Sequence, residues 1–203
     1  MFDFAVFLAN VMGLEMGKLQ ANLQTDMGSL SFTWGSTGLL KSIQIHPLSK
    51  HCKSGFSPVE GLSEAWQKVL QELTDYFGGG NPLPSIEWDD FDRGEWTDFQ
   101  QKVYEAILKI PHGETRSYAW VAEQIQKSGA AQAVGQALRN NPVPILIPCH
   151  RVINKKGSLG GFMGQKDLAL PELSLKDQLI RLEDGYLNPQ FPFMNLLQAE
   201  MAL

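Results

Sequence analysis

The stretch that most constrains this 203-residue chain is a short apolar run followed at once by three chemically active side chains. Residues 145–147 (Ile-Leu-Ile) form the run, Pro148 stops it, and Cys149, His150 and Arg151 follow. A β-branched run of this length predicts a buried extended segment, and proline, which has no backbone N–H, predicts a bend at its end. A thiol held there is either a positioned nucleophile or a buried cysteine whose neighbours point outward.

Composition indicates an ordinary globular protein of one medium or two small domains, with 43% hydrophobic and 19% charged residues. Cys52 and Cys149 are the only cysteines, so we expect no disulfide framework and a reducing, cytoplasmic setting, or the nucleus in a eukaryote. His46, His51 and Cys52 lie close in sequence but lack a fourth ligand for structural zinc, so no metal site is predicted.

Charge is distributed unevenly along the chain. Residues 1–95 carry 6 Lys and Arg against 12 Asp and Glu, whereas residues 96–185 carry 11 against 9. The second half therefore suits a polyanion better than the first, although its small excess does not predict tight non-specific DNA binding. Residues 1–24 are too short and too interrupted to span a membrane, so we expect a packed helix or a partly ordered extension and no membrane association.

Residues 25–93 predict a small domain made of a sheet and one helix. Alternating polar and apolar side chains favour two strands, at residues 29–34 and 39–45, joined by a glycine-containing turn. Apolar residues at helical spacing favour a helix over 62–77, which a run of glycines ends. The Pro- and Asp-rich residues 82–95 are typical of a linker. Nothing here carries recognisable chemistry, so we interpret this half as scaffold.

Residues 94–187 predict a mostly helical domain, followed by a tail of unassigned role at 188–203. Apolar spacing favours helices over residues 99–108, 117–125 and 131–138, with a serine cap on the second. Helix, short glycine-containing turn and helix form the helix-turn-helix shape of DNA readers. The last helix is rich in alanine and glycine, which favours either the narrow minor groove or packing against another helix.

Three motifs occur together in this half: residues 110–118 (Ile-Pro-His-Gly-Glu-Thr-Arg-Ser-Tyr), 133–135 (Ala-Val-Gly) and 141–152, which contains Pro-Cys-His-Arg. Together they strongly resemble the O6-alkylguanine-DNA alkyltransferase family, also called methylated-DNA–protein-cysteine methyltransferases. The resemblance covers residues 94–185 closely and 25–80 loosely. It implies an α+β protein with a small N-terminal sheet-plus-helix domain and a mostly helical C-terminal domain whose helix-turn-helix binds DNA by the minor groove.

The resemblance also implies a reaction. A guanine is turned out of double-stranded DNA, and the alkyl group on its O6 moves irreversibly to Cys149 without a cofactor; the family mostly acts as monomers. His150 would accept the thiol proton through a bound water, Glu183 would orient the imidazole, and Tyr118 would donate to the leaving base. Without the resemblance, Cys149, His150 and a distant glutamate suggest only thiol nucleophilic catalysis, as in a cysteine hydrolase.

The resemblance assigns further residues to the DNA, the base or the alkyl group: Gln132, Ala133, Arg139, Asn141, Pro144, Arg151, Val152, Phe162 and Met163. Among them, Asn141 would brace the loop that holds Cys149. Pro144, Phe162 and Met163 would form the wall of the alkyl pocket. Backbone groups of Cys149 and Val152 would bind the guanine edge.

Two features depart from the family pattern. Gln132 stands where the family usually has an arginine inserted into the base stack, so base flipping and DNA affinity are expected to be weaker. An apparent insertion at residues 165–173, which contains Pro171, precedes a helix at residues 176–183 and would have to loop outward for Glu183 to reach His150.

Two other functions are consistent with the sequence. A non-catalytic relative that binds alkylated DNA would fit Gln132. A helix-turn-helix regulator with a redox-sensing Cys149 would bind a specific DNA sequence and form a reversible oxidation product.

Overall fold

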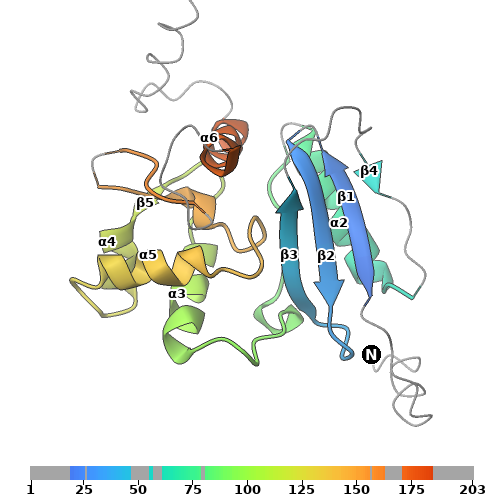
Figure 1. Cartoon of the computed structure of the whole chain (residues 1–203), viewed down its shortest axis with the longest axis horizontal. Coiled ribbons are helices and arrows are strands. Elements are labelled where there is room, and N and C mark those ends of the chain that lie inside the picture. The colour runs from blue at the N-terminus through green and yellow to red at the C-terminus, as the bar shows by residue number, and fades with distance from the viewer. Residues whose placement is uncertain are drawn as a thin grey trace, which may run out of the picture. The chain divides into compact units, whose positions relative to one another are not determined.

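The computed structural model describes residues 19–25, 27–46, 55–56, 61–78, 81–155, 157–162 and 171–184. The chain forms two compact units (Figure 1): the first runs to Trp96 and includes Pro142–Leu146, and the second comprises Thr97–Asn141 and the chain from Ile147 onward. The first contains a sheet and a helix and the second is mostly helical, so the predicted α+β class is confirmed.

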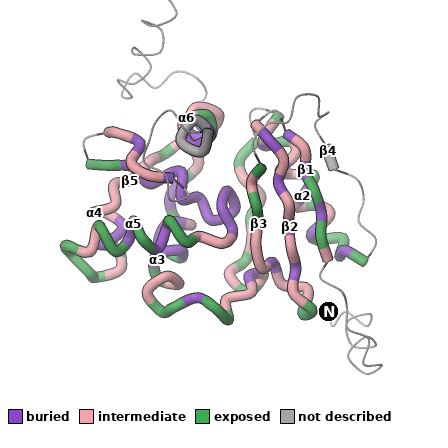
Figure 2. Tube along the Cα trace, in the orientation of Figure 1, coloured by how far each residue is buried: buried purple, intermediate pink, exposed green. Residues whose placement is uncertain are grey.

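An antiparallel sheet in the order β3-β2-β1-β4 forms the centre of the first unit. Its strands are β1 (Gln20–Thr25), β2 (Gly28–Trp34), β3 (Leu40–His46) and β4 (Gly55–Phe56). Every second residue of β2 is buried, which confirms the predicted β2–β3 hairpin (Figure 2).

Strand β1 corrects the prediction for the N-terminal extension. Residues 1–24 were expected to form a helix or a partly ordered extension, but residues 20–24 belong to β1, so that expectation is wrong for them. Polar and apolar side chains alternate here with the period of a strand, and Ala21 and Leu23 pair with Phe32 and Leu30 of β2. Residues 1–18 lie outside the described part of the chain.

Helix α2 (Glu64–Phe77) confirms the predicted helix and contributes one buried face to the core of the first unit. It begins where the Ser63 hydroxyl accepts a hydrogen bond from the backbone N–H of Trp66, as an N-cap should. Trp66 meets Trp34 of the sheet edge to face, with ring centroids 5.5 Å apart. The buried residues of α2 are Trp66, Leu70, Leu73 and Tyr76.

Residues 82–95 are not simply a linker, and the prediction is wrong for their second part. A 3₁₀ turn, η1 (Trp88–Asp90), leads into Phe91, which bridges Leu40 of β3. Trp88, Phe91 and Trp96 pack ring against ring at centroid distances of 5.7 to 6.1 Å. Packing of these rings, with Phe91 and Trp96 buried, outweighs the proline and aspartate content that suggested an open segment.

The second unit confirms the predicted helices as α3 (Asp98–Leu108), α4 (Tyr118–Gln124) and α5 (Ala131–Arg139). Ser117 caps α4 as predicted, accepting from the N–H of Trp120 at 3.1 Å. A two-stranded parallel sheet pairs β5 (Arg116–Ser117) with β6 (Val152–Ile153). The last helix, α6 (Pro171–Glu183), corrects the end of the insertion predicted at residues 165–173. Pro171 starts this helix, where its missing N–H costs nothing, instead of lying in a looped insertion. Residues 163–170 lie outside the described part of the chain.

Residues 145–147 are buried, as predicted, but they do not form an extended strand. Ile145 has a φ of +78°, which is rare for a β-branched residue, and the chain turns before Pro148. Residues 142, 144 and 148 are prolines, which cannot donate to a strand ladder, so the segment folds back on itself. The cysteine is therefore presented by a tight buried loop.

Candidate active site

Cys149 begins a single 3₁₀ turn, η2 (Cys149–Arg151), and its side chain is buried. The amide of Asn141 donates to the carbonyl oxygen of Ile147 at 2.9 Å, which ties the end of α5 to the residues just before the cysteine. Asn141 also makes a side-chain hydrogen bond with Cys149. The loop and its thiol are thus fixed by the same side chain.

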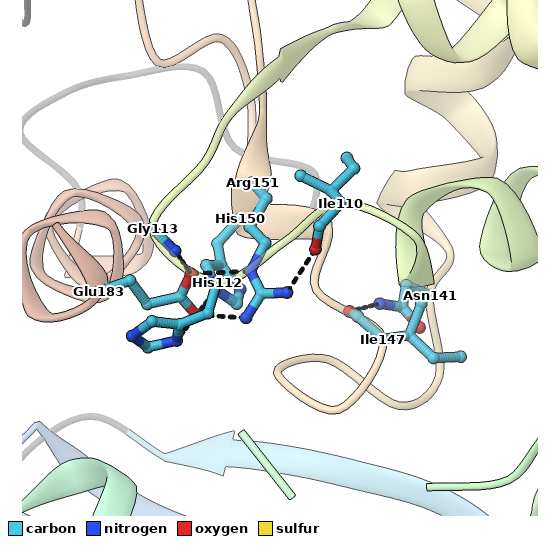
Figure 3. A network of polar contacts seen from close by, with 8 residues as sticks. All are labelled: Ile110, His112, Gly113, Asn141, Ile147, His150, Arg151 and Glu183. Atoms are coloured by element: carbon cyan, nitrogen blue, oxygen red, sulfur yellow. Dashed lines mark hydrogen bonds and ion pairs between the residues drawn. The ribbon is translucent and has the colours of Figure 1, made fainter. Parts of the chain in front are cut away.

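Glu183, the last residue of α6, places a buried carboxylate among four residues: His112, whose Nδ1 lies 3.9 Å from Oε1, Gly113, His150 and Arg151 (Figure 3). Its Oε1 lies 2.8 Å from Nε2 of His150 and accepts from Nη2 of Arg151 at 2.9 Å, while its Oε2 accepts from Nε of Arg151 at 2.7 Å. The backbone N–H of Gly113 adds a contact of 3.4 Å to Oε2. Residues far apart in the sequence therefore meet here, as expected for His150 and Glu183.

This geometry assigns the tautomer of His150. An ionised carboxylate can only accept, so Nε2 of His150 carries the proton that it donates to Glu183. Nδ1 then holds the lone pair, and it is buried without a hydrogen bond to any residue that the structure describes. Nδ1 is therefore the ring nitrogen able to accept a proton.

Burial dominates the ionisation of both members of the Cys–His pair. It raises the pKa of the Cys149 thiol, against the opposing effects of the Asn141 hydrogen bond and the Lys176 charge. Burial lowers the pKa of His150 as well, although Glu183 opposes that shift. The pKa of Glu183 lies well below its ordinary value: burial raises it, but the hydrogen bond from His150 and the hydrogen bonds and charge of Arg151 outweigh that effect. The resting site thus holds a neutral thiol, a neutral imidazole and an ionised carboxylate.

Arg151 was predicted to contact DNA, but the structure places its side chain in the interior of the site. Its side chain is 7% exposed, two of its nitrogens hold Glu183, and Nη1 donates to the carbonyl oxygen of Ile110 at 2.8 Å. A guanidinium with its donors directed inward stabilises a buried carboxylate and is not available to a phosphate. Arg151 therefore belongs to the interior of the site.

Tyr118 and the glycine loop at residues 159–161 lie against each other. The Tyr118 hydroxyl donates to the carbonyl oxygen of Gly161 at 3.3 Å, and burial raises the pKa of Tyr118 to about 12, so the hydroxyl keeps its proton. A Cβ on Gly160, whose φ is +72°, would come within 2.9 Å of that hydroxyl. A Cβ on Gly135 of α5 would lie 3.8 Å from the same ring, which is an ordinary van der Waals distance.

The remaining predicted residues fall in different places. Gln132, Ala133 and Arg139 lie on the exposed face of α5, whereas Ala137 and Leu138 on the same helix are buried. The small residues of α5 therefore lie on both faces, with Ala137 buried and Ala133 exposed, and the minor-groove alternative stays a prediction. Phe162 is buried in the second unit; Val152 is buried too, and its carbonyl accepts a hydrogen bond. Pro144 is grouped with the first unit, and Met163 lies outside the described residues.

Lys176 is the buried residue that the sequence-based assignment missed. Its Nζ donates to the carbonyl oxygens of Val152 at 2.7 Å, Leu159 at 2.6 Å and Gly161 at 3.1 Å. Helical spacing could have indicated it, because Lys176 falls four residues before the buried Ile180 and seven before Glu183.

Within the described ranges, no group of three or more His, Cys, Asp or Glu side chains is placed to hold a metal ion. No helix among those same residues has the length and apolar character needed to cross a membrane.

A buried cysteine followed by a histidine that shares a carboxylate defines a protein with a thiol nucleophile, carried on a helical unit. Comparison with known proteins narrows that class. A family model described as "6-O-methylguanine DNA methyltransferase, DNA binding domain" matches residues 98–185. A methylated-DNA–protein-cysteine methyltransferase of Mycobacterium leprae is 43% identical over 122 residues, which span 60% of this chain and 70% of the relative.

Another relative and a solved structure indicate the same family. A constitutive methylated-DNA–protein-cysteine methyltransferase of Bacillus subtilis is 44% identical over 99 residues, covering 49% of this chain and 58% of that protein. The solved structure of OGT from Mycobacterium tuberculosis in complex with DNA has a TM-score of 0.62 at 34% identity, covering 83% of this chain and 94% of that one. The chain belongs to the methylated-DNA–protein-cysteine methyltransferase family, as its motifs predicted.

Proposed function

We propose that this protein repairs DNA by moving an alkyl group from O6 of guanine to Sγ of Cys149 in a single irreversible turnover. The observation that supports this most strongly is the buried Cys149 followed by His150, whose Nε2 lies 2.8 Å from Glu183. Membership of the family supplies the substrate class, because the relatives are named for methylated DNA and a protein cysteine.

The first step is proton transfer. A neutral thiol is a poor nucleophile, and burial raises the pKa of Cys149 further, so the thiol needs a base. Nδ1 of His150 takes the thiol proton by way of a bound water, and the imidazolium that forms is stabilised by Glu183 through Nε2. Arg151 shares the same carboxylate, which keeps Glu183 ionised throughout.

The second step is displacement at the alkyl carbon. Sγ of Cys149 forms a bond to that carbon, and the bond from the carbon to guanine O6 breaks with its electron pair leaving on the base. The Tyr118 hydroxyl, which keeps its proton at neutral pH, donates to the base as this charge develops. The phenol recovers its proton by way of solvent or the imidazolium, so the net products are unmodified guanine and an S-alkylated cysteine.

Double-stranded DNA is the proposed partner, bound through the exposed face of α5 in the minor groove by one protein monomer. Gln132, Ala133 and Arg139 lie on that face. A smooth helix with a single arginine suits close approach to the backbone without reading base edges. We infer that the protein acts in the cytoplasm, or in the nucleus of a eukaryote, where its DNA substrate and a reduced thiol coexist.

The test uses a duplex that contains one O6-methylguanine. The protein is mixed with increasing amounts of this duplex, digested and mapped by peptide mass, while the DNA is analysed for the remaining lesion. We expect one methyl group per protein on the peptide of Cys149, none on the peptide of Cys52, and an equal loss of O6-methylguanine from the DNA.

The Cys149→Ala variant is the matched control and should bind the duplex without removing the lesion. An unmodified Cys149 with the lesion intact would refute the proposal and favour a non-catalytic DNA-binding relative. A reversible sulfur oxidation in place of methylation would favour a redox-sensing regulator.

A further inference from the structure

Lys176 has all three of its N–H donors satisfied by backbone carbonyls. The three acceptors, Val152, Leu159 and Gly161, come from both sides of the hairpin that follows Cys149. The lysine comes from α6, which ends in Glu183. A single buried ammonium therefore ties the helix of the catalytic carboxylate to the loop that faces Tyr118.

One of these carbonyls is shared. Gly161 accepts from Lys176 at 3.1 Å and from the Tyr118 hydroxyl at 3.3 Å, and the ammonium lies 5.9 Å from the centre of the Tyr118 ring. The two donors approach one oxygen, which has two lone pairs. The longer of the two bonds is the one made by Tyr118.

The sharing matters for the reaction because Tyr118 must leave Gly161 to donate to the guanine. Without Lys176, the buried carbonyl of Gly161 would lose its hydrogen bond when Tyr118 turns away. That loss would raise the free energy of the state in which Tyr118 donates to the guanine. Lys176 removes that penalty, since Gly161 keeps a charged donor when the phenol rotates. The ammonium also holds Gly160 against the hydroxyl and so limits where the phenol can go.

We propose that Lys176 is a positioning residue for alkyl transfer: it holds the loop at residues 159–161 and frees the Tyr118 hydroxyl to donate to the leaving base. This inference rests on the proposed function and assigns a role to a residue that does not touch the reacting atoms. It also accounts for a buried lysine that pairs with carbonyls and not with a carboxylate.

The test is the transfer rate constant at saturating O6-methylguanine duplex, measured together with the half-saturating concentration. Lys176→Met keeps the size of the side chain and removes the charge and the donors. We expect the rate constant to fall about tenfold, less than the roughly 10²-fold or more that loss of the proton donor itself would cost, with half-saturation and affinity for undamaged duplex unchanged. Lys155→Met, at an exposed position of the same hairpin, is the matched control and should behave as wild type.

A double-mutant cycle with Tyr118→Phe separates positioning from general damage to the fold. If Lys176 acts through the Tyr118 hydroxyl, Lys176→Met should slow transfer much less in the Tyr118→Phe background than in the wild type. Equal losses in both backgrounds, or a wild-type rate in the single variant, would overturn the proposal. If Lys176→Met does not fold, the cycle is repeated with Lys176→Gln, whose amide is too short to reach all three carbonyls.

Failure of both variants to fold would make Lys176 a residue of the fold alone and would also overturn the assignment. Methyl transfer by the wild-type protein is the reference for every measurement. If the wild type transfers no methyl group, the proposed function fails; if it transfers and the cycle shows no coupling, only the role of Lys176 fails.

Discussion

The two units of this protein build their interiors from different material. In the first, the described core is apolar and aromatic, with Phe32, Trp34 and Trp66 packed ring to ring, and Thr25 is its one buried polar residue. In the second, besides Cys149 and Tyr104, four polar or charged side chains are buried among the apolar ones: His150, Arg151, Lys176 and Glu183.

The difference indicates that the interior of the second unit is built for a reaction and not for apolar packing alone. Apolar burial stabilises a fold at about 25 cal/mol per Å² without needing partners, whereas a buried charge destabilises it unless its geometry is well matched. Each of the four polar or charged groups in the second unit has such a match, in the Glu183 cluster or among the carbonyls around Lys176. Perturbed ionisable groups gathered beside a cysteine are typical of a reaction centre.

The largest effect should follow from neutralising the shared carboxylate. Glu183→Gln leaves Arg151 buried opposite a neutral amide and removes the charge that stabilises the imidazolium. We expect the transfer rate constant to fall by about 10²-fold or more and the free energy of unfolding to fall by about 3 to 5 kcal/mol. Single-turnover kinetics and denaturant titration measure the two.

Glu95→Gln is the matched control, because Glu95 is 83% exposed and pairs only at the surface, with Lys41. It should change neither quantity appreciably. Transfer at the wild-type rate by Glu183→Gln would show that the buried cluster is structural and would erase the contrast between the two units.

Shortening a buried apolar side chain in the first unit should lower the stability of the protein without slowing alkyl transfer. Leu70 is fully buried on α2, and Leu70→Ala should lower the free energy of unfolding by about 2 to 5 kcal/mol through lost burial and a cavity. The folded fraction should transfer methyl at the wild-type rate, measured well below the melting temperature. A slower transfer by the folded variant would mean that the first unit takes part in the reaction and would contradict our interpretation of it as scaffold.

The sequence predicted the regular elements because their signals are local. Ser117 capping α4 and the alternation in β2 each depend on a few neighbouring residues. The errors arose where contacts distant in sequence override local pattern. Residues 145–147 carry a strand-like composition, but the surrounding prolines prevent a ladder and Ile145 turns with a positive φ.

In the site, too, the residues of recognisable motifs were identified from the sequence, whereas the distant contacts of Arg151 and Lys176 were not. Cys149, His150 and Glu183 were identified through motif resemblance, and the carboxylate and the imidazole do meet. The interior position of Arg151 was not predicted, because nothing local distinguishes an arginine that binds phosphate from one that binds a glutamate 32 residues away. Lys176 was missed for a related reason, since its acceptors are backbone carbonyls that have no signature in the sequence.

The charged interior should also make the protein sensitive to acid. The pKa of His150 is lowered from 6.5 by folding, so its contribution to stability is complete above 6.5 and is lost as the pH falls toward the folded value. The lowered pKa of Glu183 adds a second loss below its ordinary 4.5. The melting temperature, measured from pH 8 to about pH 2, should therefore decline in two stages.

Two variants distinguish the two stages in the decline of the melting temperature. His150→Asn should flatten the decline between pH 6.5 and 4.5, and Glu183→Gln should flatten the part below 4.5. Melting curves that depend on pH in the same way in wild type and His150→Asn would show that other groups control acid unfolding.

The smallest predicted effect on transfer follows from adding a positive charge on the exposed face of α5. It compares a charge on the surface of the second unit with the charges in its interior. Gln132 stands where the resemblance implies an arginine, so Gln132→Arg places a cation and a longer side chain at the position expected to fill the space left by the flipped base. We expect a few-fold gain in affinity for lesion duplex or in transfer rate, of the order of 1 kcal/mol, with a steeper salt dependence of binding.

Gln124→Arg adds the same charge at an exposed position of α4 and is the control for simple attraction to DNA. If both variants gain equally, the improvement comes from counterion release and not from base flipping. If Gln132→Arg alone accelerates transfer at saturating duplex, the base-flipping step limits the natural protein. No change in either variant would mean that Gln132 does not restrict delivery of the base and that the rate is set in the interior, by the charges around Cys149.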